Sequence, residues 1–272
     1  MENSLTMLAS VGHGQMNSFI ITTADNKVIL IDGGYRTDAE KLLSELKRIT
    51  GSETPHIDAW FLSHPHLDHI GAFNEIIENH FDEISFESIY FSFPSVQFVE
   101  KTEPKERKDI ADFYADLPKF ADRICVVTEG DTYEVGGARF DILYSPDPSF
   151  KKNAVNNAGI VFRMTLGGKT FMFLGDAGVE AGGKLLKLHG NSLKSDYCQM
   201  AHHGQNGVDR HVYEAICPDV CLWCTPLWLW NNDAGKGYNT HSWKTVIVRG
   251  WMDEIGVKEH YVAKDGDICL DI

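Results

Sequence analysis

The sequence predicts an α/β fold, with a single domain over residues 1–272 in which two β-sheets are flanked by helices. Three observations lead to this prediction. Short β-branched and aromatic runs alternate with amphipathic stretches to the end of the chain. No Pro- or Ser-rich linker, block of like charge or short repeat divides it. A length of 272 residues suits one large α/β domain, and helices on the outer faces of two sheets are the simplest layering.

Strands are expected where a short apolar run lies between turn residues. These runs are 18–23, 27–31, 57–62, 88–91, 124–127, 139–144, 159–166, 170–174, 197–200, 220–224, 258–262 and 268–272. The segment 38–49 predicts a helix because Leu42, Leu46 and Ile49 fall on one face, with Asp38 as its expected cap. Further helices are expected at 69–79, 105–122, 179–188, 209–216 and 242–255.

The charge balance argues against one class of function. The chain has 25 Lys and Arg residues against 39 Asp and Glu residues, a formal net charge of −14. Nonspecific affinity for nucleic acid comes mainly from Lys and Arg that displace counterions. An extended basic groove is therefore not expected, and nucleic acid is considered only as a substrate at a local site.

Other features of the composition bear on location. No apolar run reaches the ~20 residues that span a bilayer, and the first ten residues lack the pattern of a signal peptide. We therefore expect a cytoplasmic protein without a membrane partner. Six cysteines fit reduced core thiols, with Cys221 and Cys224 on opposite faces of a strand. The polar segment 94–122 is expected to be an exposed loop and helix without a catalytic part.

The strongest chemical signal follows the strand 57–62 and is residues 63–69, SHPHLDH. Pro65 biases His64 toward an extended backbone, so His64 and His66 are expected to point the same way. Asp68 and His69 turn in at the start of the next helix. Imidazole and carboxylate groups that converge on one point predict a divalent metal site.

This motif, His64-X-His66-X-Asp68-His69, resembles the signature of the metallo-β-lactamase superfamily. Further motifs support the resemblance, namely LIDGG at 30–34, FLGD at 173–176 and MAHHG at 200–204. The pattern resembles in particular the metallo-β-lactamase-like domain of bacterial competence DNA-uptake channel proteins, through VGHG at 11–14, NN at 156–157 and THS at 240–242. The resemblance implies a four-layer αβ/βα sandwich with its metals at the edge between the two sheets.

The resemblance also implies the ligands of two divalent metal ions, with zinc expected first and manganese or iron as alternatives. His64 and His66 would bind the first ion. Asp68, His69 and His202 would bind the second, and Asp176 would bridge the two. Asp68 would also orient the metal-bound hydroxide. Asp32 either supports the histidine loop by hydrogen bonds or is an ordinary turn residue.

The chain departs from the family pattern at the first metal. The third histidine expected there is missing, since no histidine lies between His80 and His189. Asn156 or Asn157 takes its place, and an amide oxygen is a weaker ligand than imidazole. Ser10 and Gln15 stand where the competence proteins usually have aspartates. We therefore expect the second metal site to bind more tightly than the first.

Several other residues are candidates for substrate contact. His203 is expected to point away from the metals if its segment is a strand, as a supporting residue or a substrate contact. His13 lies between two glycines and is a candidate to line the site. His241 is a candidate proton donor to the leaving group, or else merely part of the following helix start. The aromatic segment 227–238 either stacks on a substrate or packs on the core.

These observations predict a metal-dependent hydrolase with a dinuclear centre, acting on a phosphodiester or another phosphorylated small molecule. One alternative is hydrolysis of a carboxylic ester, thioester, lactone or amide by the same hydroxide, because fold does not fix substrate. The other is a noncatalytic metal- or ligand-binding protein, which the missing histidine would explain.

Overall fold

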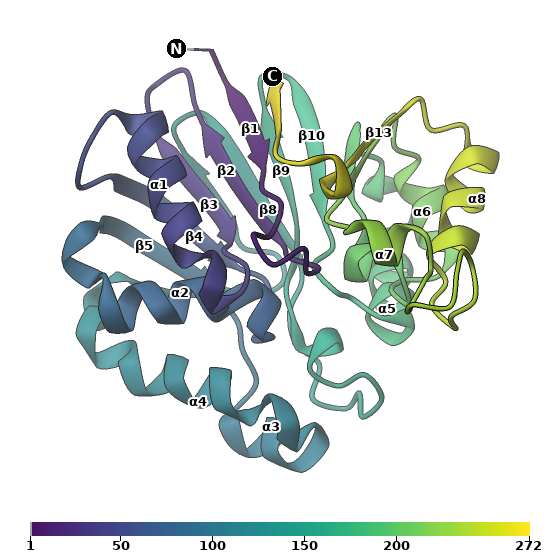
Figure 1. The fold of residues 1–272 in the computed structure, drawn as a ribbon, viewed down its shortest axis with the longest axis horizontal. Coiled ribbons are helices and arrows are strands. Elements are labelled where there is room, and N and C mark those ends of the chain that lie inside the picture. Colours follow the sequence, from purple (N-terminus) through teal and green to yellow (C-terminus); the bar gives the residue numbers. More distant parts are fainter. Residues whose placement is uncertain (1) are drawn as a thin grey trace.

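The computed structural model describes residues 2–272, which form two seven-stranded sheets packed face to face with helices on both outer sides (Figure 1). The first sheet has the strand order β14-β1-β2-β3-β4-β5-β6. Its strands are β1 (Ser4–Met7), β2 (Ser18–Thr22), β3 (Val28–Asp32), β4 (His56–Leu62), β5 (Ser85–Phe91), β6 (Ile124–Val126) and β14 (Ile268–Asp271). The last strand of the chain thus completes the first sheet, where it pairs antiparallel with β1.

The second sheet has the order β13-β12-β11-β10-β9-β8-β7. Its strands are β7 (Thr132–Val135), β8 (Ala138–Tyr144), β9 (Val161–Leu166), β10 (Lys169–Phe173), β11 (Tyr197–Gln199), β12 (Val220–Trp223) and β13 (Glu259–Val262). In each sheet four neighbouring strands are parallel, β3 to β6 in the first and β10 to β13 in the second. Their carboxyl ends therefore meet at common edges, where α/β proteins usually place their sites.

Helices cover the outer face of each sheet (Figure 1). They are α1 (Ala39–Thr50), α2 (Leu67–Asn79) and α4 (Arg107–Asp116) on the first side, and α5 (Val179–His189), α6 (Arg210–Ile216), α7 (Leu227–Trp230) and α8 (Thr245–Ile255) on the second. The short helix α3 (Val96–Thr102) lies next to α4 at the bottom of the view in Figure 1. Three apolar cores separate the four layers. Strand β4 shows how, because Trp60 packs toward α2 while Phe61 packs between the sheets. The predicted αβ/βα sandwich is confirmed.

Every predicted strand is present, and four elements were not predicted: β1, β7, α3 and α7. The predicted helix 105–122 is shorter, because Pro118 follows α4 within a 3-10 turn and lacks the N–H that would continue an α-helix. The helix expected at 242–255 begins at Thr245. Asp38 precedes α1, but its carboxylate accepts from Ser10 Oγ (3.0 Å) and Val11 N (2.8 Å) rather than capping the helix.

Two smaller predictions concern cysteines and membranes. Cys221 and Cys224 are free, buried thiols that face different cores, as the strand interpretation requires. Within residues 2–272, no helix is long and apolar enough to cross a membrane.

Candidate metal centre

The candidate site lies at the carboxyl ends of strands from both sheets. The first sheet contributes Asp32 at the end of β3 and residues 63–69 after β4. The second contributes Asp176 after β10 and the 201–204 turn after β11. Segments far apart in sequence thus bring three buried carboxylates and several imidazoles together at the seam between the sheets.

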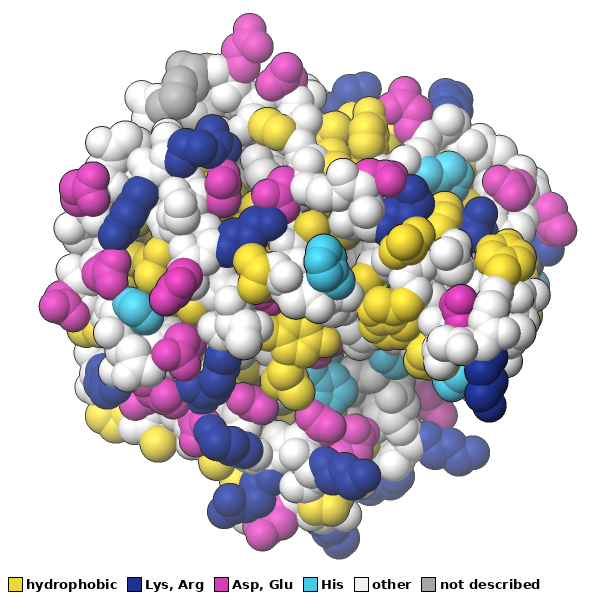
Figure 2. All heavy atoms as spheres, in the orientation of Figure 1, with side chains coloured by type: hydrophobic (Ala, Val, Ile, Leu, Met, Phe, Trp, Pro, Cys, Tyr) yellow, Lys and Arg dark blue, Asp and Glu magenta, His cyan; other side chains and the backbone are white. Residues whose placement is uncertain are grey.

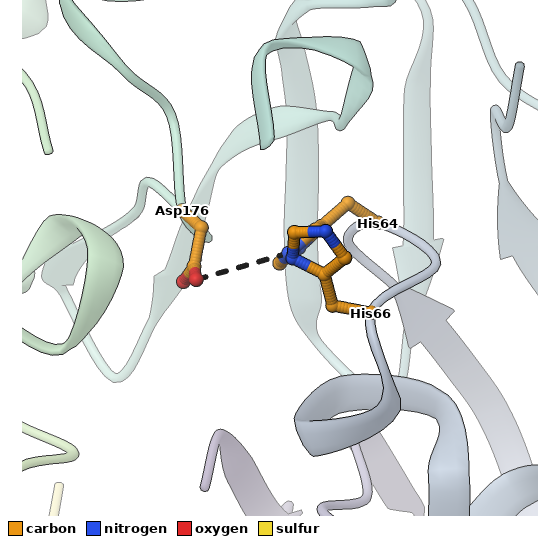
Figure 3. A group of neighbouring side chains, drawn as sticks. All are labelled: His64, His66 and Asp176. Carbon is orange, nitrogen blue, oxygen red and sulfur yellow. Dashed lines mark hydrogen bonds and ion pairs between the residues drawn. The ribbon is translucent and has the colours of Figure 1, made fainter. Parts of the chain in front are cut away.

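The first group of possible metal ligands is His64, His66 and Asp176. Both histidines project from the loop after β4 toward Asp176 (Figure 3). His64 Nε2 lies 3.1 Å from His66 Nδ1 and 3.8 Å from Asp176 Oδ2. Two nitrogens that bind one metal at ~2 Å are themselves about 3 Å apart, so the His64–His66 separation suits two ligands of one ion.

The second group is Asp68, His69 and His203, all buried. His203 Nε2 lies 3.2 Å from Asp68 Oδ2 and 3.5 Å from Asp176 Oδ2. His69 Nε2 lies 3.2 Å from Asp176 Oδ1. Asp176 therefore faces ligands of both groups, which is the position that a bridging carboxylate needs.

The structure differs from the sequence prediction at the histidine pair after β11. His203 completes the second group, whereas His202 was the predicted ligand. The prediction that His203 points away assumed a strand, but both residues have left-handed backbones (φ 51° and 54°) in a tight turn. Both rings consequently face Asp176. His202 Nε2 is 3.8 Å from Asp176 Oδ2, and its side chain is 18% exposed.

Hydrogen bonds fix which ring nitrogen faces the carboxylates. His69 Nδ1 donates to Asp32 Oδ2 (2.7 Å), and His203 Nδ1 donates to the carbonyl oxygen of Cys224 (3.1 Å). His64 Nδ1 lies 3.1 Å from Ser63 Oγ, which itself donates to Asp32. In all three histidines Nε2 is therefore the ring nitrogen directed at the site, an arrangement found for metal-binding imidazoles.

The buried polar atoms that lack a hydrogen bond test whether metal ions fit the site. Within residues 2–272, the buried atoms without a hydrogen bond include Nε2 of His69, Nε2 of His203 and Oδ1 of Asp176. Buried polar atoms normally find a partner because their burial alone is unfavourable. These three atoms converge on one place and are nitrogen and oxygen donors, which divalent cations bind. The donor set fits two such ions.

Asp32 holds the histidine loop, which decides between its two sequence interpretations. Its Oδ1 accepts from Ser63 N, and its Oδ2 accepts from Ser63 Oγ, His69 Nδ1 and Asn17 Nδ2, all at 2.7 Å. The residue is fully buried with a left-handed backbone (φ 54°). Asp32 is therefore the hydrogen-bonding centre of the loop that carries the candidate ligands.

The titrating groups of the site are of two kinds. In one kind neighbouring charges decide the direction of the pKa shift, and in the other kind burial decides it. Burial would raise the pKa of Asp176, yet His203 and His69 hold it well below its ordinary value. Burial would lower the pKa of His203, but Asp176 and Asp68 raise it to about 9, and the pKa of His69 is raised in the same way by Asp176 and Asp32. Burial dominates at His64 and His202, whose pKa values are lowered. Without metal, the site is a compact set of ion pairs.

The segment 94–122 contributes to the site, contrary to the sequence expectation. Val99 and Ile110 pack against Val155 in a small separate core, which brings the start of this segment beside the histidine loop. Glu103 Oε2 lies 3.8 Å from His66 Nε2, and Glu103 Oε1 accepts from Val155 N (3.0 Å). Nothing in the sequence pattern singled out Glu103 among the many charges around it.

The two asparagines differ in what they do. Asn157 Oδ1 accepts from Gly178 N (2.9 Å) and Ala181 N (3.2 Å), so it holds the start of α5. Asn156 Oδ1 is buried without a hydrogen-bond partner, and its side chain lines a small hollow with His64 and Asp176. Of the two candidates, Asn156 is the one with an amide oxygen free at the first group.

An open cavity of about 250 Å³ gives access to the site. It is lined by Gln15, Tyr35, His66, Leu67, Asp68, Glu106, Asp176 and His202. Gln15 Nε2 donates to Asp68 Oδ2 (2.9 Å) and so occupies a position beside the second group. On the face shown in Figure 2, Lys and Arg side chains are interspersed with Asp and Glu, and no continuous basic patch covers it.

His241 and the aromatic segment lie apart from these groups. The His241 side chain is exposed, and its ring stacks on Trp243 with centroids 3.6 Å apart. Among the interactions of residues 2–272, none joins the His241 side chain to a candidate ligand.

The tryptophans of the aromatic segment 227–238 differ in their contacts. Trp230 packs on Trp223, and the Arg249 guanidinium lies over the Trp230 ring, which favours the core-packing interpretation for Trp230. Trp228 Nε1 donates to the carbonyl oxygen of His13, and both line a neighbouring cavity of about 430 Å³.

Comparisons with solved structures show the same fold. CmlA, a diiron beta-hydroxylase from Streptomyces venezuelae, matches with a TM-score of 0.59 and 14% identity over 100% of this chain and 54% of that chain. Zn²⁺-bound PqqB from Methylobacterium extorquens matches with a TM-score of 0.56 and 12% identity, over 99% and 100% of the two chains. YhfI from Bacillus subtilis, a metallo-beta-lactamase fold protein, gives 0.53 and 13% identity over 98% and 99%.

Sequence comparisons identify the family. ComE operon protein 3 of Bacillus subtilis (strain 168) is 26% identical over 161 residues, which make up 58% of this chain and 18% of that protein. The chain thus matches only a small part of this relative, and it spans about half the length of CmlA. The family model of the metallo-beta-lactamase superfamily matches residues 11–146, half of the chain. This protein therefore belongs to the metallo-beta-lactamase superfamily.

Proposed function

We propose that the chain is a metal-dependent hydrolase with a dinuclear centre that acts on a phosphodiester or another phosphorylated substrate. The observation that carries the proposal is the position of Asp176. Its carboxylate lies within 3.8 Å of His64 in the first group and within 3.5 Å of His69 and His203 in the second. One carboxylate between two sets of nitrogen donors is the arrangement expected for a pair of bridged cations.

When bound, two such ions supply a hydroxide at neutral pH and stabilise both the attacking and the leaving oxygen of a displacement. The protein's own residues hold this arrangement. Asp32 and Cys224 orient His69 and His203, and Ser63 orients His64. Asp68 faces the open cavity, so its carboxylate is placed to bind metal and to accept a hydrogen bond from the attacking water.

A phosphorylated substrate suits the charge of the site. Two divalent cations would bring four positive charges against the three carboxylates Asp32, Asp68 and Asp176, so before a hydroxide forms the centre would carry a net positive charge in an otherwise acidic protein. That charge would attract an anionic phosphoryl group locally, without an extended basic groove, which the composition argues against.

Carboxylic esters, thioesters, lactones and amides remain the alternative substrates, and a noncatalytic binding role remains the alternative function. Zinc is the first expectation for the metal, and iron is retained because CmlA is described as a diiron protein. The cytoplasmic location also stays a prediction.

The proposal is tested by metal analysis of protein purified without added metal, followed by assays on chromogenic phosphodiesters, carboxylic esters and lactams. We expect up to two metal ions per chain and activity on phosphodiesters. Asp68→Ala should abolish turnover in a protein that still folds, while Asp219→Asn, at an exposed ion pair with Lys258, should not. Metal-loaded protein without activity on any ester would favour the binding role, and lactam or carboxylic-ester activity alone would contradict the phosphodiester assignment.

A further inference from the structure

His66, in the candidate first group, lacks the ring support that the other candidate histidines have. His64, His69 and His203 each place one ring nitrogen beside a hydrogen-bonding group of the protein, which leaves Nε2 for the site. His66 is turned the other way. Its Nδ1 faces His64 Nε2 at 3.1 Å, and its Nε2 is buried without a hydrogen-bond partner.

The group nearest to this unpartnered nitrogen is a carboxylate. Glu103 Oε2 lies 3.8 Å from His66 Nε2, a separation that a small side-chain rotation would close to a hydrogen bond. The carboxylate is also anchored, because its other oxygen accepts from Val155 N at 3.0 Å. Pro104 disfavours a helical backbone at the residue before it, and Glu103, with φ −140° and ψ 70°, has accordingly left the helical conformation of α3.

Glu103 does not belong to the candidate ligand group itself. The atoms of His64, His66 and Asp176 all lie within 4.8 Å of one another, and Glu103 is outside this set. Its oxygen lies on the far side of the His66 ring, against Nε2, while Nδ1 is the nitrogen that faces the other ligands. A carboxylate behind a metal-binding imidazole fixes its tautomer and raises its basicity.

We infer that Glu103 is a positioning residue for the first metal site, accepting a hydrogen bond from His66 Nε2–H so that Nδ1 is the metal-binding atom. This inference rests on the proposed dinuclear centre. It explains how a site without the third histidine retains metal, since the more basic His66 offsets part of the missing ligand. It also assigns a purpose to the α3 segment, which otherwise only covers the surface.

The first test is metal affinity, measured by calorimetric titration of the metal-free chain with Zn²⁺ in the presence of a competing chelator. Glu103→Gln should weaken the looser binding event about 10- to 100-fold and leave the tighter one unchanged, and Glu103→Asp should recover part of the loss. The matched control is Glu100→Gln, which lies in α3 three residues before Glu103 but is exposed and paired with Arg107. Equal affinities for Glu103→Gln and Glu100→Gln would overturn the inference, while two bound metals would leave the proposed function intact.

The second test does not need bound metal. Nitrogen NMR of the histidine side chains, at mildly alkaline pH in metal-free protein, shows which ring nitrogen carries the proton. Two acceptors compete for this proton in His66, the Glu103 carboxylate at Nε2 and the neutral His64 ring at Nδ1. Because a carboxylate is the stronger acceptor, His66 should carry the proton on Nε2, and the preference should shift to Nδ1 in Glu103→Gln. A proton on Nδ1 of His66 in the unaltered chain would overturn the inference. Because this readout uses metal-free protein, failure of the proposed metal centre would be recognised separately.

Discussion

The two candidate ligand groups differ in how the protein supports them. The group of Asp68, His69 and His203 is fully buried, and both of its histidines are held by hydrogen bonds from the sheet ends. The group of His64, His66 and Asp176 includes His66, which is partly exposed. The Nε2 side of its ring faces Glu103, which comes from a separate segment. The comparison teaches that one site is built by the sandwich itself and the other depends on an added helical segment. The site of His64, His66 and Asp176 should therefore bind metal more weakly, and lose it more easily, than the site of Asp68, His69 and His203.

The largest effect is expected from Asp176→Ala, because this carboxylate faces both groups. Loss of a shared ligand should reduce bound metal from two ions to fewer than one per chain and lower turnover by more than ~100-fold, the upper end for an outer-sphere partner. Metal quantification after dialysis checks this, with Asp219→Asn as the exposed control. Two retained ions would show that Asp176 does not connect the groups.

Substitutions of the two neighbouring histidines, His202 and His203, test which of them is a ligand in the second group. His203→Ala should remove the tighter metal-binding event, because His203 Nε2 is buried 3.2 Å from Asp68. His202→Ala should have a smaller effect, since His202 is farther from Asp176 and partly exposed. Titration of both variants with Zn²⁺ makes the comparison. The reverse order would restore the ligand assignment that the sequence motif implies.

Asp32→Asn tests the support of the second group rather than a ligand. The substitution removes the charged acceptor of His69 Nδ1 and of the Ser63 backbone. We expect the tighter metal site to weaken by about 10- to 100-fold, with a lower unfolding temperature of the metal-free protein. If metal affinity stays unchanged while stability falls, Asp32 would be a purely structural residue.

The effect of pH follows from the raised pKa of His203. That pKa is about 9 in the folded metal-free chain, against an ordinary value of 6.5. The stabilisation that this shift gives is fully present below pH 6.5 and is lost as the pH rises through 9. The pKa values of Asp68 and Asp176 are lowered, so their contribution does not change in this range.

Metal must displace the proton from His203, so metal binding releases protons and strengthens with pH. Thermal melts with and without Zn²⁺ at pH 6.5 and pH 9 measure this. The increase in unfolding temperature that metal causes should be larger at the higher pH. An increase that is the same at both values would mean that no ligand is protonated in the metal-free state.

The smallest effect is expected from His241→Ala, which should leave metal binding at both groups unchanged. Two phosphodiesters that differ only in their leaving group test the predicted proton donor. Selective slowing of the poor leaving group would support general acid catalysis. Equal rates would leave His241 as a residue that stacks on Trp243 and precedes α8.

The sequence predicted the fold, and it predicted which loop brings most of the candidate ligands together. The dense motif after β4 put His64, His66, Asp68 and His69 on one loop, and the structure places all four in the two candidate groups, because short-range spacing determines their geometry. The orientation of His203 toward the second group could not be predicted, because its left-handed backbone, φ 54°, is not evident from a histidine pair followed by glycine. Glu103 was missed because its position depends on a small core with Val155, a contact between segments some 50 residues apart. Such contacts leave no periodic signal.

The most direct test of the two-site account is a Zn²⁺ titration of the metal-free chain alongside His64→Ala and His203→Ala. The account predicts two binding events per chain. His64→Ala should lose only the weaker event and His203→Ala the tighter one, because the second group is the better supported. A chain that binds no metal, or one in which His64→Ala removes the tighter event, would contradict it.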